Sequence, residues 1–247
     1  MRAVVDPSAT VNDELAGRHL QVAHWLRDVH KPGEVLLNVG CGFGPLESFV
    51  LKDGLDVNVI SLEPSIGDLA VIRRRINSPR VRFCVGSAIS LPVADESIDM
   101  YVASEVLEHI PRNTESAMFQ ELARVLKPGG RALITTPRWS ALGNATDPAW
   151  WLTGHRHYQK HVMIHMVQCA GLGEWTLEPR GRQFEILSMW DLYISKWLLR
   201  RPPIFLAKTN PRVSSEWAPD PARPGFTHWW LEIHKPIPVN AEDEKDR

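Results

Sequence analysis

Three glycines at alternate positions follow directly after a short apolar run. Residues 38–48 read NVGCGFGPLES and the run before them is Val35–Leu37, so Gly40, Gly42 and Gly44 lie in a turn that leaves a strand. A backbone without side chains lets a ligand approach closely, which is why nucleotide-binding turns are rich in glycine. The spacing predicts a nucleoside-binding loop or, as the plainer alternative, an ordinary strand-to-helix turn.

The loop departs from the glycine pattern of dinucleotide-binding proteins. In G-x-G-x-x-G the third glycine permits close helix packing, and amides at the helix N-terminus hold a pyrophosphate. Here Pro45 stands at the third glycine position, and proline has no N–H for an anion, although it fits a first helical turn. The loop therefore favours a flat, uncharged or cationic nucleoside over a pyrophosphate.

An acidic residue follows the second apolar run. The run Val57–Leu62 ends at Glu63, 23 residues beyond Gly40. A carboxylate at the tip of a second strand can accept hydrogen bonds from both ribose hydroxyls. We expect Glu63 to bind a ribose; the alternative is an exposed helix-capping carboxylate before Pro64.

Several side chains could move a proton during catalysis. His109 lies in EVLEHIP after the fourth apolar run, and His155, His157 and Tyr158 lie in TGHRHYQKHVMIH after the fifth. Imidazole and phenol groups serve as general bases, so we consider all four as catalytic candidates. Pocket lining or helix packing is the alternative for His109, and a solvated loop for the others. Arg156 could instead anchor a carboxylate or phosphate of an acceptor.

The sequence gives little evidence for a metal site or for disulfide bonds. His161 and His165 have the i, i+4 spacing of a chelating pair, but no HExxH motif or nearby carboxylate set accompanies them, so we predict no metal site. Cys41, Cys84 and Cys169 are odd in number and lack a CxxC spacing. They argue against a disulfide framework and a zinc site and favour a reducing cytoplasm.

Short apolar runs that alternate with helical patterns predict the scaffold for these residues. Such alternation indicates parallel strands joined by right-handed crossovers, in an α/β sheet with helices on both faces. Pro128 and Gly129-Gly130 are expected to end the helix before the fifth strand. Residues 12–30 predict a leading amphipathic helix with Asn12 or Asp13 as its N-cap. The predicted strands are residues 35–39, 57–62, 81–85, 100–103 and 132–135, and one predicted crossover helix is 115–126.

The composition changes after Pro137, where nine of the ten tryptophans lie. We expect helices at 160–170 and 184–199, a proline-rich loop from there through Pro224, and a late strand at 228–236. The polar tail 237–247 is predicted to be disordered. Residues 1–236 are predicted to be one domain.

Length and charge exclude several classes of protein. At 247 residues and 44% hydrophobic composition, the chain can bury one sizeable core. The 28 basic residues nearly cancel the 29 acidic ones without a long basic stripe, so no nucleic-acid partner is expected. The N-terminal stretch breaks at Pro7 and no later stretch is apolar for about 18 residues, so we predict neither export nor membrane spanning.

Four segments in order resemble the class I S-adenosylmethionine-dependent methyltransferases, particularly the small-molecule enzymes called type 11. The matching segments are LLNVGCGFG, VISLEPS, VRFCVGSAISLPVADESIDMYVASEVLEHI and VLKPGGRALITTP, which together cover most of residues 36–137. The resemblance implies a Rossmann-like, mostly parallel seven-stranded sheet with the last strand antiparallel. It also implies S-adenosylmethionine as cofactor, with S-adenosylhomocysteine as product, across the carboxyl ends of the strands.

The resemblance also implies which residues contact the cofactor. Gly40, Cys41, Gly42 and Gly44 would contact its methionine part and ribose, Glu63 with Pro64 and Ser65 its ribose, and Ser87, Ala88 and Ile89 its adenine, while Ser104, Glu105 and Val106 would line the methyl-transfer side. Two positions depart from the family pattern. Asn38 stands where the family usually has Asp or Glu near the cofactor's amino group, and Ser87 stands where many members have Asp.

The acceptor side is predicted to consist of residues 138–165 and 182–224. The 184–199 helix is apolar over half its surface, and packing against the sheet or a partner chain is the plainest reason. Other readings are a lid over an apolar or ring-containing acceptor and, with Arg200 and Arg201, peripheral contact with a membrane that holds a lipid-linked substrate.

Together these features predict methyl transfer to an oxygen, nitrogen or carbon atom of a small molecule, such as a sugar or secondary metabolite, by a monomer or homodimer. An NAD-binding oxidoreductase is one rival, which Pro45 disfavours. A non-catalytic methyltransferase-like binding protein is the other, and Asn38 and Ser87 favour it.

Overall fold

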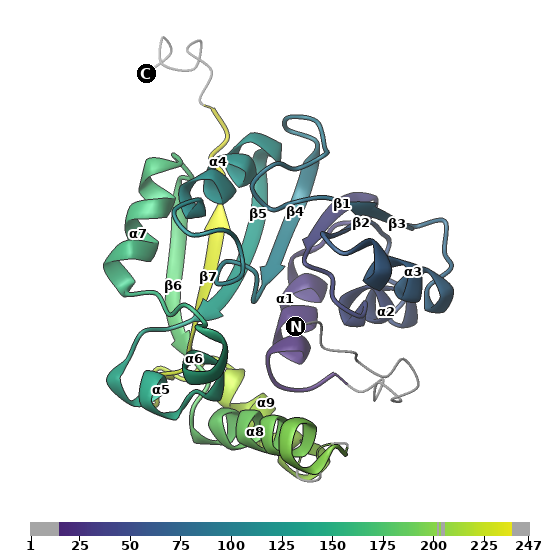
Figure 1. Ribbon diagram of the computed structural model, residues 1–247. Helices are drawn as coiled ribbons and strands as arrows, with labels where there is room; N and C mark the ends of the chain where they lie inside the picture. Colours follow the sequence, from purple (N-terminus) through teal and green to yellow (C-terminus); the bar gives the residue numbers. More distant parts are fainter. Residues whose placement is uncertain (1–14, 202, 204–205, 239–247) are drawn as a thin grey trace.

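A seven-stranded sheet organises the chain, as predicted. The computed structural model describes residues 15–201, 203 and 206–238 (Figure 1). The strand order is β3-β2-β1-β4-β5-β7-β6; β1 to β5 are parallel, and β7 is antiparallel to both of its neighbours. The strands are β1 Glu34–Val39, β2 Val57–Glu63, β3 Val81–Val85, β4 Ile98–Ser104, β5 Leu126–Pro137, β6 Glu174–Arg180 and β7 His228–His234.

Helices cover both faces of the sheet because successive side chains of each strand point to opposite sides. Leu36 packs with the first three helices, α1 Gly17–Val29, α2 Pro45–Lys52 and α3 Ile66–Arg75. Leu37, the next residue, packs on the opposite face with α4 Glu115–Val125 and α7 Lys160–Cys169 (Figure 1). The five predicted parallel strands are therefore confirmed as strands, but β3 lies at the edge of the sheet and only its Val81 is buried, so the prediction that it is a buried strand is wrong.

The C-terminal half adds helices at one end of the sheet. These are α5 Ala141–Thr146, α6 Pro148–Thr153, α8 Gln183–Tyr193, its π-helical continuation η1 Ile194–Leu199, and α9 Leu206–Trp217. The buried Glu216 carboxylate of α9 accepts hydrogen bonds from the backbone N–H groups of Arg182, Phe184 and Glu185. Glu216 thus supplies the N-terminal cap of α8 and holds the two helices together.

Three expectations about helices need correction. The leading helix begins at Gly17 with Ala16 as N-cap, and Asn12 and Asp13 lie outside the described residues. The predicted loop through Pro224 is wrong in its middle, because α9 continues through Pro211. The crossover helix α4 ends at Val125, before the PGG segment, which lies within β5.

The PGG segment forms an irregularity in the sheet instead of ending a helix. Leu126 pairs with Ile98, and the next registered pair is Arg131 with Met100, so residues 127–130 bulge from the ladder. Gly129 adopts a positive φ of 77° there. The predicted helices 160–170 and 184–199 are confirmed, and the late strand ends at His234 instead of Pro236. Most of the 237–247 tail lies outside the described residues.

Within the described ranges, no helix is both long and apolar enough to cross a membrane.

Candidate cofactor and acceptor site

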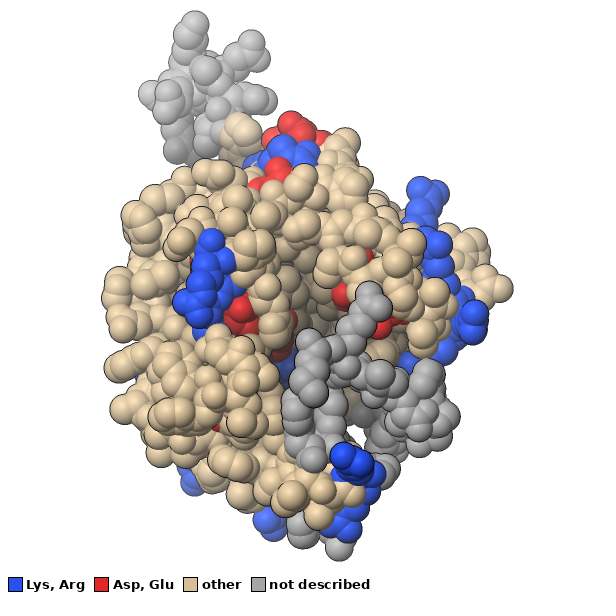
Figure 2. Space-filling model, in the orientation of Figure 1, with Lys and Arg blue, Asp and Glu red and all other residues tan. Residues whose placement is uncertain are grey.

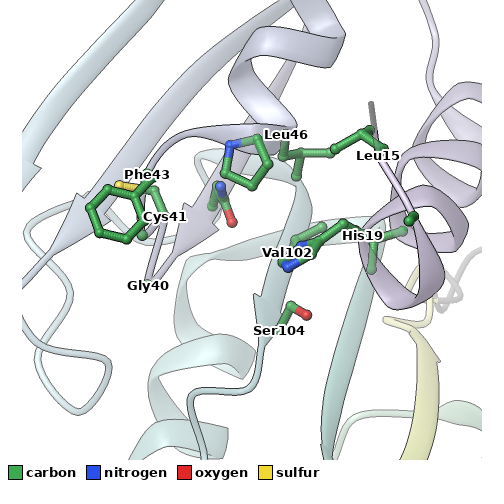
Figure 3. A pocket seen from close by; sticks show the side chains of 13 residues that line it. Leu15, His19, Gly40, Cys41, Phe43, Leu46, Val102 and Ser104 are labelled. Atoms are coloured by element: carbon green, nitrogen blue, oxygen red, sulfur yellow. The ribbon is translucent and has the colours of Figure 1, made fainter. Parts of the chain in front are cut away.

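A cavity of about 380 Å³ opens at the carboxyl ends of β1 and β4 (Figure 3). The glycine turn forms one wall, and α1 with the two described residues before it forms the opposite wall, to which Leu15 and His19 contribute. Side chains from β4, Val102 and Ser104, lie between them. The parallel strands bring these segments to one edge of the sheet, which is where α/β folds bind ligands.

All three loop glycines have positive φ angles. These angles are 70° at Gly40, 53° at Gly42 and 75° at Gly44. A Cβ atom on Gly40 would lie 2.6 Å from Cγ2 of Val106, whereas one on Gly42 would meet nothing within 4 Å. Backbone conformation therefore requires glycine at each position, and close packing requires it again at Gly40.

The start of the turn is tied to the next strand. The backbone N–H groups of Gly40 and Cys41 both donate to the carbonyl oxygen of Leu62, at 2.8 and 3.1 Å. These two amides are thus used within the fold, and Cys41 is buried. The loop therefore presents bare backbone to the cavity, while its first two amide groups are not free to donate. This arrangement suits a nucleoside better than a pyrophosphate, which needs free amide donors.

Glu63 ends β2 beside the glycine turn. Its carboxylate accepts a hydrogen bond from the backbone N–H of Ser65 at 3.5 Å. Burial raises the pKa of the Glu63 carboxyl, against the opposing effect of the N–H groups of Ser65 and Gly42. Ser65 follows Pro64 and caps α3 by accepting from the N–H of Asp68. A half-buried acceptor that faces a bare turn fits a ribose diol.

A buried carboxylate that the sequence analysis missed lies behind Asn38. Oε1 of Glu47, in α2, accepts from Nδ2 of Asn38 at 2.7 Å and from Oγ of Ser61 at 2.5 Å. Burial raises the pKa of the Glu47 carboxyl, and those two hydrogen bonds oppose the change. Asn38 also lines the cavity. A carboxylate is thus present next to Asn38, although the chain lacks one at position 38 itself.

The segment expected to border adenine forms a tight turn after β3. The N–H of Ile89 donates to Oγ of Ser87 at 3.4 Å, and Ser87 forms a bridge with Ser90. Ala88 between them is buried in the core. The turn follows β3 at the same sheet edge as the glycine loop.

The end of β4 carries a charged network. Glu105, at a positive φ of 57°, places Oε2 3.1 Å from Nε2 of His228 and 3.4 Å from Nη1 of Arg18. Burial alone would raise the pKa of Glu105, but the positive charges of Arg18 and His228 outweigh it and hold the pKa well below the ordinary value. The hydroxyl of Ser104 lies 3.0 Å from that of Thr135. Sequence spacing gave no signal for the roles of Arg18 or His228.

Two histidines 46 positions apart meet at the same edge. Nε2 of His109 lies 3.1 Å from Nε2 of His155, and the ring centroids are 4.6 Å apart. Burial lowers the pKa of the His155 ring to about 4. The side chain of His109 is 61% exposed, so the pair can be reached from solvent. Figure 2 shows acidic side chains around the hollow at the centre of this face.

The neighbouring candidates are held inside the fold. His157 pairs one ring nitrogen with Oδ2 of Asp147 at 2.7 Å and the other with Oδ1 of Asn144 at 2.8 Å. The buried hydroxyl of Tyr158 donates to the carbonyl oxygen of Leu107 at 2.9 Å, and burial raises its pKa. Both side chains therefore have internal partners, unlike the accessible pair of His109 and His155.

The interpretation of Arg156 as an acceptor anchor is wrong. Its guanidinium donates to the carbonyl oxygens of Leu107 and Glu108, at 2.9 and 3.0 Å, and to that of Ile110. It also pairs with the carboxylate of Glu115. Arg156 thus braces the 107–110 turn against the loop after β5.

Part of the chain is similar to known methyltransferases. Residues 37–134 match the family described as methyltransferase domain. Methyltransferase GfsG of Streptomyces halstedii is 35% identical over 134 residues, and the match covers 52% of this chain and 47% of the length of GfsG. A 37.1 kDa protein encoded in transposon TN4556 of Streptomyces fradiae is 33% identical over 148 residues, covering 58% of this chain and 41% of its own. The chain spans about half the length of the curated relatives it matches.

A solved structure resembles a larger part of the chain. Phosphoethanolamine N-methyltransferase 2 of Haemonchus contortus, in complex with phosphomonomethylethanolamine and S-adenosylhomocysteine, superposes with a TM-score of 0.65 at 20% identity. The match covers 92% of this chain and 55% of that one. At this identity the likeness shows a shared fold.

Proposed function

Since residues 37–134 form a methyltransferase domain of the class I, S-adenosylmethionine-dependent kind, we propose that the chain transfers a methyl group from S-adenosylmethionine to a small-molecule acceptor. The observation that carries the proposal is the cavity at the carboxyl ends of β1 and β4, with a positive-φ glycine turn beside the Glu63 carboxylate. The receiving atom is an oxygen, nitrogen or carbon.

The residues at this edge of the sheet fit the chemical groups of this cofactor, and Asn38, Gly40, Gly42 and Ser104 among them line the cavity itself. The bare turn at Gly40–Gly44 supports the methionine part and the ribose, and Glu63 accepts from the ribose hydroxyls. The Asn38 side chain lies at the cavity, with the Glu47 carboxylate behind it, and together they provide a polar site for an ammonium group. The turn at Ser87–Ile89 borders the adenine, and Ser104–Val106 face the methyl group.

The cofactor supplies a methyl group on a positively charged sulfur, which is already activated for in-line displacement. The protein therefore needs to align the acceptor, exclude water and, for a protonated acceptor, help to remove a proton. His109 and His155 are accessible, adjacent to each other and beyond the end of β4. We assign acceptor activation to this pair, with His157 and Tyr158 holding the loop that carries His155.

The nature of the acceptor is inferred from the helices of the C-terminal half. Leu187, Trp190, Ile194 and Leu198 follow one side of α8 and η1 and are 55%, 42%, 41% and 76% exposed. In Figure 2 the surface over α5 and α6, next to α8, is mostly uncharged, and Lys and Arg side chains lie along the lower edge of the molecule. Together with the predicted acceptor-side segments 138–165 and 182–224, this surface supports an acceptor with an apolar part.

A membrane-held acceptor is a more specific form of the same proposal. Arg200 and Arg201 follow the apolar stripe directly and are exposed. An apolar stripe next to basic side chains is typical of helices that lie on anionic lipid surfaces. The enzyme would then meet its acceptor at the membrane surface.

Ligand binding tests the core of the proposal. S-adenosylhomocysteine should raise the melting temperature of the purified protein and bind in calorimetry, because it shares the adenosine and methionine parts of the cofactor. NAD serves as the comparison ligand. Stabilisation by NAD without stabilisation by S-adenosylhomocysteine would favour an oxidoreductase, and a stable fold that binds neither would refute cofactor binding.

Methyl transfer itself is then tested with cofactor labelled on its methyl group. Candidate acceptors are screened for label incorporation, and mass spectrometry of compounds retained during purification narrows the screen. The wild-type protein should transfer label to an acceptor, and substitution of Glu63 should reduce this transfer. Binding of S-adenosylhomocysteine without transfer to any acceptor of the screened classes would favour the non-catalytic binding protein.

A further inference from the structure

Three potential metal ligands converge at the carboxyl edge of the sheet. Nε2 of His109 lies 3.1 Å from Nε2 of His155 and 3.9 Å from Oε1 of Glu108. One donor atom from each residue lies within 4.8 Å of the other two. Glu108 and His109 belong to the turn after β4, whereas His155 comes from the loop before α7, so the fold itself creates this juxtaposition.

One of these atoms lacks any other partner. The Glu108 side chain is fully buried, and its Oε2 accepts a hydrogen bond from Oγ1 of Thr136 at 3.0 Å. Its Oε1, on the side of the histidines, is buried without a hydrogen-bond partner among the described residues. An unpaired buried carboxylate oxygen is costly, and a bound cation would satisfy it.

The spacing of the two imidazoles suits a shared metal ion. With metal–nitrogen bonds of about 2.05 Å, a separation of 3.1 Å between the nitrogens corresponds to an angle of about 98° at the metal. That angle lies between the octahedral and tetrahedral values. A tetrahedral site would place the carboxylate oxygen about 3.4 Å from each nitrogen, which is about 0.5 Å closer to Nε2 of His109 than the present 3.9 Å.

We infer that Glu108, His109 and His155 form a binding site for a first-row divalent transition metal such as Zn²⁺. Two imidazoles and one carboxylate are ligands that such ions prefer, and three protein ligands leave a coordination position open. The exposed side of His109 provides the entry path. The site is distinct from the His161 and His165 pair considered from the sequence.

The surroundings hold the ligands in place. Arg156 donates to the carbonyl oxygens of Leu107, Glu108 and Ile110, which fixes the backbone on both sides of His109. A second set, Asp147 with His155 and His157, is less suited, because Asp147 and His157 are already paired with each other at 2.7 Å. Contacts outside the ligand set, such as the hydrogen bonds of Arg156, orient the ligands in known metal sites.

The role of the metal in catalysis rests on the proposed function. An acceptor hydroxyl or amine that occupies the open position would lose its proton to a solvent water more readily, because the metal stabilises the resulting lone pair. The histidine pair would then activate the acceptor by holding the ion. Metal binding itself does not depend on methyl transfer.

Cobalt titration tests the site directly. Protein freed of metal with a chelator is titrated with Co²⁺, whose visible absorption reports nitrogen and oxygen ligation. One equivalent should bind, and Glu108→Gln and His155→Gln should each weaken binding at least about tenfold, because each removes a ligand. The control His165→Gln, on α7, should bind Co²⁺ like the wild type.

Co²⁺ binding that both ligand variants retain, or binding that only the control loses, would overturn the site. Circular dichroism checks folding, and if the buried Glu108 variant fails to fold, the His155 variant decides the question. Calorimetry with S-adenosylhomocysteine on the same samples separates the two proposals. Intact cofactor binding with no specific Co²⁺ binding would reject the metal site alone.

Discussion

Alanine at Gly40 should destabilise the protein more than alanine at Gly42. Both substitutions force a side chain into the left-handed region, at φ angles of 70° and 53°, which costs about 1–2 kcal/mol each. Only at Gly40 does the new Cβ atom meet a neighbour, 2.6 Å from Cγ2 of Val106. Overpacking of that kind costs about 1–3 kcal/mol more. The free energy of unfolding should therefore fall by about 2–5 kcal/mol at Gly40 and by about 1–2 kcal/mol at Gly42.

A second substitution separates the two causes. Val106→Ala removes Cγ2, and the nearest remaining Val106 atom, Cβ, lies at an ordinary contact distance of 3.8 Å from the alanine Cβ. In the Gly40→Ala background this change should recover the stability lost to overpacking. The stability lost to the left-handed backbone of alanine should not be recovered. Urea unfolding of the wild type, both single variants and the double variant should give a coupling energy of about 1–3 kcal/mol. Equal destabilisation at Gly40 and Gly42, or no coupling with Val106, would refute this account of the loop.

Three further predictions concern the cofactor, pH and the apolar surface. Glu63→Ala should weaken S-adenosylhomocysteine binding by about 1–3 kcal/mol, or about 5- to 150-fold, while Glu63→Gln should lose less; unchanged affinity in calorimetry would remove Glu63 from the site. Because burial raises the pKa of Glu47 in the folded state, its proton favours folding, so stability should fall as pH rises from the ordinary glutamate pKa through the folded value. Glu47→Gln should flatten that part of the pH profile, and identical profiles in urea unfolding would contradict it. The double variant Leu187→Gln, Leu198→Gln should sediment less with anionic lipid vesicles than the wild type does. The control Ile66→Gln, at a 77% exposed site on α3, should sediment like the wild type. Equal sedimentation of the double variant and the control would argue against a membrane role for α8.

The sequence predicts the parallel core well because its strands are short, apolar and separated by clear breaks. Leu36 and Leu37 belong to opposite faces of the sheet, and both are buried, which gives a continuous apolar run. β6 was not among the runs because its residues alternate between exposed and half-buried and include Pro179. α9 was missed because Pro211 lies inside it and prolines flank it, a pattern typical of a loop.

The site was predictable only where one segment carries the information. The glycine turn and Glu63 follow from local spacing, and the structure places the Glu63 carboxylate beside the Gly42 N–H, although only the turn lines the cavity. Glu47 gave no signal, because a glutamate in a short helix is usually exposed, whereas here it faces Asn38 and Ser61. The meeting of His109 with His155 depends on a crossover that no local pattern encodes.

The position of β7 bears on how the molecule is synthesised. β7 lies between β5 and β6 and bonds to both, yet it follows both in the chain. During translation β5 and β6 therefore leave the ribosome before the strand that joins them in the sheet. Until residues 228–234 emerge and insert, each has an open row of backbone groups that another chain could bind. We expect nascent chains stalled before this segment to recruit chaperones, and chains released after it to complete the sheet by themselves.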